Sequence, residues 1–178
     1  IVIQDGQTFY YNSATAAYDD WNAYSYTVEG DVTLKQRNNT TATNYATFNN
    51  GDITVDGGGI LRVLNAHSAS TNEIVGGILG SAKLNLASGT ILNLDSSSSS
   101  SSGGLEFGLD IVGDGTIDFE YANATTWFYL SGLSSNFTGL VRGDRFNGEV
   151  RFAAGNGAIN ADVQIGRSEQ NKTCKLNL

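Results

Sequence analysis

The feature of this sequence that most constrains its fold is a long succession of very short segments in which apolar and polar residues alternate. Alternation with a period of two is typical of β-strands, because successive side chains point to opposite faces. Gly, Asn and Asp, which favour turns, bound almost every segment, and no stretch keeps the apolar spacing of an amphipathic helix. We therefore predict an all-β chain. Its strands are expected at residues 31–34, 52–55, 60–63, 82–86, 90–94, 105–107, 116–119, 127–130, 148–152 and 162–165.

The spacing of these segments narrows the choice of all-β architecture. From Ile117 to Val163 the strand centres recur about every 11 residues, and two such steps form a module of about 22 residues. A module of that length suits one coil of a parallel β-solenoid, in which each coil buries its apolar face against the next. An antiparallel sandwich uses similar spacing. The pattern of short strand, Gly turn and short strand, which recurs at residues 51–63, 80–94 and 113–119, favours the solenoid.

The length of 178 residues suits a single domain. We expect the repeats to occupy residues 46–166 and a short tail to follow at residues 167–178. Residues 1–45 are interpreted as an irregular, aromatic-rich N-terminal cap that covers the open end of the first coil. The seven consecutive serines at residues 96–102 are interpreted as a flexible loop between coils. The chain begins without Met and is interpreted as a fragment of a longer exported protein.

Composition excludes several classes of function. The sequence holds 18 acidic residues against 10 Lys and Arg, for a net charge of −8, which disfavours a nucleic-acid partner. One histidine, His67, and one cysteine, Cys174, cannot build a zinc site or a supported Cys–His nucleophile. We expect no cofactor. No apolar run approaches the roughly 20 residues of a membrane-spanning helix, so we expect this segment not to span a membrane. A polar, acidic chain with almost no cysteine suits a secreted or bacterial cell-surface protein.

Two stretches of the sequence resemble a known repeat. Residues 130–140 read Leu-Ser-Gly-Leu-Ser-Ser-Asn-Phe-Thr-Gly-Leu, and residues 146–152 read Phe-Asn-Gly-Glu-Val-Arg-Phe. Together they resemble the repeat of autotransporter passenger domains, in which a Leu-Ser-Gly step leads through an aromatic-Thr-Gly turn into another strand. Residues 113–117, Gly-Asp-Gly-Thr-Ile, resemble the step that precedes it. The resemblance covers about residues 50–166. It implies a right-handed parallel β-helix exported to the bacterial surface, and it also suits a related secreted bacterial β-helix protein.

Acidic residues supply the candidates for catalysis and metal binding. Asp118 and Glu120 flank Phe119, so both carboxylates are expected on one face of a strand. Such a pair can perform acid–base chemistry on glycosidic bonds, although outward polar residues are ordinary on a half-buried strand. Asp110, Asp114 and Asp118 could offer oxygen ligands to Ca²⁺. Their spacing of four does not match an EF-hand, and Asp-Gly is a common turn dipeptide.

Aromatic residues and one tripeptide supply the candidates for binding. Trp21, Trp127 and Tyr129 could stack on sugar rings. The tripeptide Arg142-Gly143-Asp144 has the sequence that integrins recognise, and it is expected at a turn, although so short a match arises often by chance.

The sequence leaves three functions open. The leading hypothesis is a structural, adhesive surface scaffold without catalysis. Its partners would be a host surface protein, a host glycan or neighbouring copies of the same chain. The alternatives are a carbohydrate-active β-helix enzyme that uses the acidic residues, and a carbohydrate-binding module that uses the aromatic ones.

Overall fold

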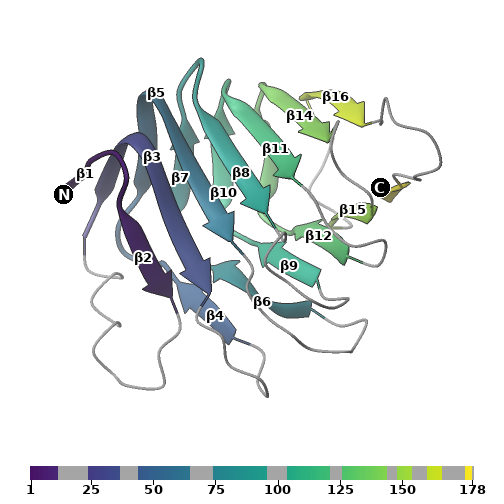
Figure 1. Ribbon diagram of the computed structural model, residues 1–178. Helices are drawn as coiled ribbons and strands as arrows, with labels where there is room; N and C mark the ends of the chain where they lie inside the picture. Colours follow the sequence, from purple (N-terminus) through teal and green to yellow (C-terminus); the bar gives the residue numbers. More distant parts are fainter. Residues whose placement is uncertain are drawn as a thin grey trace.

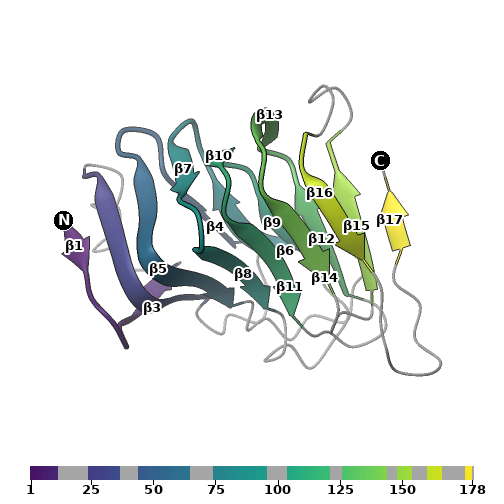
Figure 2. The ribbon, with the colours of Figure 1, turned by 90° about the horizontal axis from the view of Figure 1, so that it is seen from above.

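The computed structural model describes residues 1–11, 24–36, 44–64, 74–95, 104–120, 126–143, 148–153, 160–165 and 175–177. Within these residues every regular element is a β-strand, and every strand pairing is parallel. The strands stack as a β-solenoid whose axis runs from the N-terminal to the C-terminal end (Figures 1 and 2). The predicted all-β solenoid is confirmed.

The described strands form three faces along the solenoid. Face 1 and face 2 belong to one sheet that bends between them, and face 3 is a separate sheet. Face 1 contains β1 (Val2–Ile3), the first half of β3 (Tyr26–Gln36), the first half of β5 (Ile53–Leu64), β7 (Lys83–Leu86), β10 (Asp110–Gly113) and β13 (Leu133–Phe137). Face 2 contains β2 (Thr8–Tyr11), the second halves of β3 and β5, β8 (Ile91–Asp95), β11 (Thr116–Glu120), β14 (Leu140–Gly143) and β16 (Asp162–Ile165). Face 3 contains β4 (Asn44–Thr47), β6 (Ile74–Leu79), β9 (Gly104–Phe107), β12 (Thr126–Leu130), β15 (Gly148–Phe152) and β17 (Lys175–Asn177).

The path of the chain through these faces fixes the handedness of the solenoid. In Figure 1 the chain descends on face 2 at the front, passes face 3 at the bottom and returns upward on face 1 behind. It advances from left to right while doing so, which makes the solenoid right-handed.

The corner between face 1 and face 2 changes along the molecule. Strand β5 runs continuously through it, and Gly57 and Gly58 bend the strand with φ angles of 61° and 79°. In the next coil the corresponding chain is divided into β7 and β8, and the amide of Thr90 donates to the carbonyl of Ala87 at 3.1 Å in the turn between them. The predicted pattern of strand, Gly turn and strand therefore corresponds to this corner.

Inward side chains from the three faces fill one core. Along β11 burial alternates, with Ile117 and Phe119 fully buried and Asp118 and Glu120 half-buried on the outside. The ring of Phe119 on face 2 packs against Phe128 on face 3, with centroids 5.2 Å apart. The alternation seen in the sequence is therefore the alternation between core and outer surface.

The coils differ in length. Arg62 and Asn93, which are neighbours on face 2, lie 31 residues apart in sequence, whereas Asp118 and Arg142 lie 24 residues apart. The predicted module of about 22 residues therefore fits the C-terminal coils better than the earlier ones. Much of the difference lies in the chain between face 2 and face 3.

Regular stacking begins before residue 46, because β1 and β2 pair with β3, and β3 pairs with β5. The coils thus extend into the segment that the sequence assigns to an irregular cap. Of the seven aromatic residues between positions 9 and 26, Tyr18 and Trp21 lie outside the described residues, as does the serine run at residues 96–102. Phe9 packs against the core and Tyr26 is buried in it, whereas Tyr24 is exposed. In the tail, β17 pairs with β15 and continues face 3.

Candidate functional site

The outer surface of face 2 carries three rows of side chains parallel to the solenoid axis. Parallel pairing aligns equivalent positions of successive coils, so each row takes one residue from each strand. The central row contains Thr33, Arg62, Asn93, Asp118, Arg142 and Gln164. The row toward face 3 contains Lys35, Leu64, Asp95 and Glu120. The row toward face 1 contains Asp31, Ile60, Ile91, Thr116, Leu140 and Asp162.

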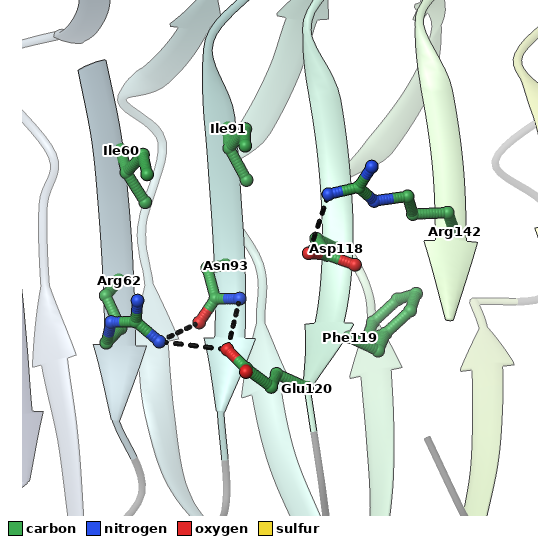
Figure 3. A pocket seen from close by; sticks show the side chains of 8 residues that line it. All are labelled: Ile60, Arg62, Ile91, Asn93, Asp118, Phe119, Glu120 and Arg142. Atoms are coloured by element: carbon green, nitrogen blue, oxygen red, sulfur yellow. Dashed lines mark hydrogen bonds and ion pairs between the residues drawn. The ribbon is translucent and has the colours of Figure 1, made fainter. Parts of the chain in front are cut away.

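A concavity of about 330 Å³ lies on this surface, over the middle coils. Figure 3 shows the side chains that line it and the hydrogen bonds among them. The lining residues are Ile60 and Arg62 from β5, Ile91 and Asn93 from β8, Asp118, Phe119 and Glu120 from β11, and Arg142 from β14. The lining is therefore mixed: polar groups dominate, and two isoleucines form an apolar border on the side of face 1.

Arg62 is the centre of one polar cluster in the concavity. Its Nη1 donates to the Oδ1 of Asn93 and to the Oε2 of Glu120, each at 3.0 Å. Asn93 Nδ2 donates to the same Glu120 oxygen at 3.1 Å, which closes a triangle of three side chains from three coils. Two more carboxylates lie within ion-pair distance of Arg62, those of Asp95 at 3.6 Å and Asp31 at 3.9 Å. The guanidinium therefore links four successive coils.

Arg142 and Asp118 form a second polar pair, one coil further along. Arg142 Nη2 donates to Asp118 Oδ2 at 3.0 Å. The other carboxylate oxygen of Asp118, Oδ1, is buried and has no hydrogen-bond partner in the described part of the chain. Each carboxylate of the candidate catalytic pair thus accepts a hydrogen bond from its own arginine.

The structure places Asp118 and Glu120 as the sequence predicts, on one face of β11 with Phe119 directed into the core. It also adds two arginines beside them, which alternation within one strand cannot reveal.

The tripeptide at residues 142–144 is placed differently from the prediction. Arg142 and Gly143 belong to β14, where they pair with Gln164 and Ile165 of β16. The expected turn is therefore wrong for these two residues, and Asp144 lies outside the described residues. Arg142 faces outward but is engaged with Asp118, so the guanidinium is part of the face 2 surface.

Tyr129, the aromatic candidate whose side chain the structure describes, does not line the concavity. Tyr129 is half-buried on β12, which belongs to face 3. Trp127 lies on the same strand, but its side chain is outside the described part of the structure, and so is Trp21. A sugar-stacking platform made of these three residues stays a prediction.

The calcium candidates are distributed over two faces. Asp110 lies on β10 of face 1, Asp114 is exposed just after that strand, and Asp118 lies on face 2. Among the described residues no group of three or more His, Cys, Asp or Glu side chains could hold a metal ion. His67 and Cys174 lie outside the described residues.

Sequence reasoning did not single out Arg62, Asn93 or Asp95, although they form much of the polar cluster. Arg62 and Asn93 are outward positions of predicted strands, so the alternation alone marks them only as exposed. Asp95 lies one residue beyond the predicted strand at 90–94 and belongs to β8 in the structure. The useful signal is the register between coils, which aligns Arg62 with Asn93 and Asn93 with Asp118.

Comparisons with protein-family models, with curated proteins and with solved structures found no match for this chain. In the part of the chain that the structure describes, no helix has the length and apolar character needed to cross a membrane.

Proposed function

We propose that this chain is an adhesin-type scaffold of a bacterial surface, or a secreted relative of one, that mediates attachment or cell–cell contact without catalysis. One observation carries the proposal: the central row of face 2, in which every residue is polar, stays in register over consecutive coils. Coils of parallel strands are spaced about 4.8 Å apart, so this row forms a periodic polar strip. Such a surface suits many weak contacts that act together.

The rigidity of face 2 supports the same function. Strands β5, β8, β11 and β14 each pair with strands on both sides, so their backbone groups are engaged in the sheet. A recognition surface on such a support loses little conformational freedom on binding. The partner would be a host surface protein, a host glycan or a neighbouring copy. The resemblance of residues 113–117, 130–140 and 146–152 to autotransporter passenger repeats favours export to the surface.

A carbohydrate-active enzyme is the second candidate, and a specific observation favours it. Asp118 and Glu120 project from one strand into a concavity, and positions two apart on a strand are separated by about 6.6 Å. Inverting glycosidases place their two carboxyl groups roughly 6.5–9.5 Å apart. However, one of the two must donate a proton, and both carboxylates here accept hydrogen bonds from arginine. This arrangement favours a binding surface over a catalytic pair.

The test of the scaffold function compares dense and sparse display of the protein. Beads that carry the chain at high density are expected to adhere to cultured epithelial cells or to one another. Beads with sparse coating should adhere far less, because weak contacts act together only at high density. Beads coated with an unrelated acidic protein are the control. Absence of both cell adhesion and bead agglutination at high density would contradict the proposal.

A separate assay addresses catalysis. The chain is incubated with plant, fungal and bacterial polysaccharides, and new reducing ends are measured. We expect none above background. Release that is abolished by both Asp118→Asn and Glu120→Gln, but retained in Glu149→Gln on face 3, would establish the enzyme instead.

A further inference from the structure

The charges of the face 2 concavity restrict the ligands that it can accept. Two arginines, Arg62 and Arg142, and two carboxylates, Asp118 and Glu120, line it, so their formal charges cancel. Asp31 and Asp95 add negative charge beside Arg62. This excess of carboxylates would repel an anionic ligand. A cationic ligand would be repelled by the two guanidinium groups, which lie at ion-pair distance from the carboxylates. The concavity therefore favours an uncharged polar ligand.

The hydrogen-bonding groups of the concavity alternate between donors and acceptors. Guanidinium groups and the Asn93 amide donate, whereas the carboxylates and the Asn93 carbonyl accept. All of them are planar groups held in place by their neighbours, as the Arg62–Asn93–Glu120 triangle shows (Figure 3). A hydroxyl group both donates and accepts. A ligand with several hydroxyls can thus bind such a surface without leaving a donor or acceptor unpaired.

The apolar border of the concavity adds a second requirement. Ile60 and Ile91 are half-buried neighbours in the row toward face 1. Covering their exposed carbon atoms needs a ligand that has an apolar C–H surface beside its hydroxyls. Sugar rings combine these two surfaces.

The shape of the surface indicates a chain rather than a single small molecule. The central row continues beyond the concavity at both ends, to Thr33 and to Gln164. Polar groups thus recur about every 4.8 Å along the solenoid axis. An extended peptide would bind best by adding to a sheet edge, but the strands below the concavity are paired on both sides. Recognition here must use side chains.

We infer that the face 2 concavity binds a segment of an uncharged saccharide chain that lies along the solenoid axis. This inference rests on the proposed function and names the ligand class of its surface. The volume of the concavity, about 330 Å³, is within the range of small-ligand sites, about 300–1,000 Å³. The concavity therefore accommodates one part of the saccharide, while the outward rows contact the rest. Arg62, Asn93 and Glu120 supply the central hydrogen bonds.

Isothermal titration calorimetry with defined hexasaccharides tests the inference. The neutral probes are cellohexaose, maltohexaose, chitohexaose and mannohexaose, and hexagalacturonate is the anionic comparison. We expect binding of at least one neutral probe, and at least about tenfold weaker binding by Arg62→Gln. Arg151→Gln is the matched control, because Arg151 has a similar partner, Glu149, on face 3 at 2.8 Å. It should change the affinity less than about twofold.

A measurement on the unaltered protein avoids any effect of substitution on folding. In ¹⁵N-labelled protein the side-chain amide signal of Asn93 should shift when the bound neutral probe is added. The corresponding signal of Asn85, which donates to Thr54 on face 1, should not shift.

The outcomes separate this inference from the proposed function. If coated beads adhere but no neutral probe binds, or if Arg62→Gln binds the probe as well as the unaltered protein does, the saccharide site is wrong and the scaffold function stands. Binding of hexagalacturonate alone also overturns the neutral ligand class. Saccharide binding without bead adhesion would instead contradict the scaffold function.

Discussion

Arg62 is the residue at which most of the polar contacts of face 2 converge. It contacts Asn93 and Asp95, which are 4% and 6% exposed, as well as the more exposed Glu120 and Asp31. Buried polar groups are costly when a partner is removed, because they cannot turn to water instead. The arginine is therefore expected to stabilise the stack of coils in addition to shaping the concavity.

Replacing Arg62 by methionine tests this structural role. The substitution keeps much of the side-chain volume but removes the donors, and we expect the free energy of unfolding to fall by about 2 kcal/mol. Arg151→Met on face 3 is the control, because Arg151 is 38% exposed and pairs with Glu149 on its own strand. It should cost about 0.5 kcal/mol. Urea denaturation followed by circular dichroism gives both values, and equal losses would contradict the special role of Arg62.

At the scale of the element, several strands with large inward apolar residues were predicted, whereas β10 and β13 were missed despite the buried Ile111 and Phe137. The predicted segments 148–152 and 162–165 coincide with β15 and β16. Strand β6 was missed, because Gly76 and Gly77 interrupt its alternation and its register with β9 shifts. A Cβ atom at Gly77 would collide with the carbonyl oxygen of Glu106. The close approach of two coils therefore requires glycine at this position. A glycine inside a strand interrupts the apolar–polar alternation by which strands are recognised in a sequence.

The candidate site was predictable only where it lies on a single strand. Asp118 and Glu120 share β11, so alternation identifies them together. Arg62 reaches Glu120 from 58 residues earlier in the chain. That contact depends on the register between coils and hence on the lengths of the intervening connections, which vary from coil to coil.

Gly113, at the end of β10, is a glycine that we expect to tolerate substitution poorly. Its φ angle is 103°, and an added Cβ would collide with the carbonyl oxygen of Leu86 in the neighbouring coil. Gly89 is a matched control, because its φ angle is 78° but a Cβ there would meet nothing within 4 Å. Gly89→Ala should cost about 1–2 kcal/mol from backbone strain alone.

Gly113→Ala should cost clearly more, about 4 kcal/mol, because the backbone of two coils must separate. Thermal unfolding of both variants measures the difference. Similar losses would show that backbone conformation, and not coil contact, determines the requirement for glycine at this corner.

At the scale of the whole molecule, the solenoid is a linear stack in which the core of each coil packs against the coils on either side, although the Arg62 side chain also reaches Glu120 two coils away. The inward row of face 2 shows the consequence. Val32, Leu61, Leu92, Ile117 and Val141 are buried, whereas Val163, the next position on β16, is 38% exposed. The positions of this row with described coils on both sides are thus covered, and β16 is the last strand of face 2 in the described residues.

Replacing valine by threonine at Val141 and, separately, at Val163 tests whether burial in this row depends on the neighbouring coils. Threonine has nearly the shape of valine and keeps its preference for strands, so the substitution isolates the cost of placing a hydroxyl in the row. Val141→Thr should lower the free energy of unfolding by about 2 kcal/mol, because the hydroxyl is fully buried among apolar side chains. Val163→Thr should cost less than about 0.5 kcal/mol, because water reaches the exposed hydroxyl. Denaturant unfolding distinguishes the two, and an equally large loss at Val163 would show that another surface covers this end of the solenoid in solution.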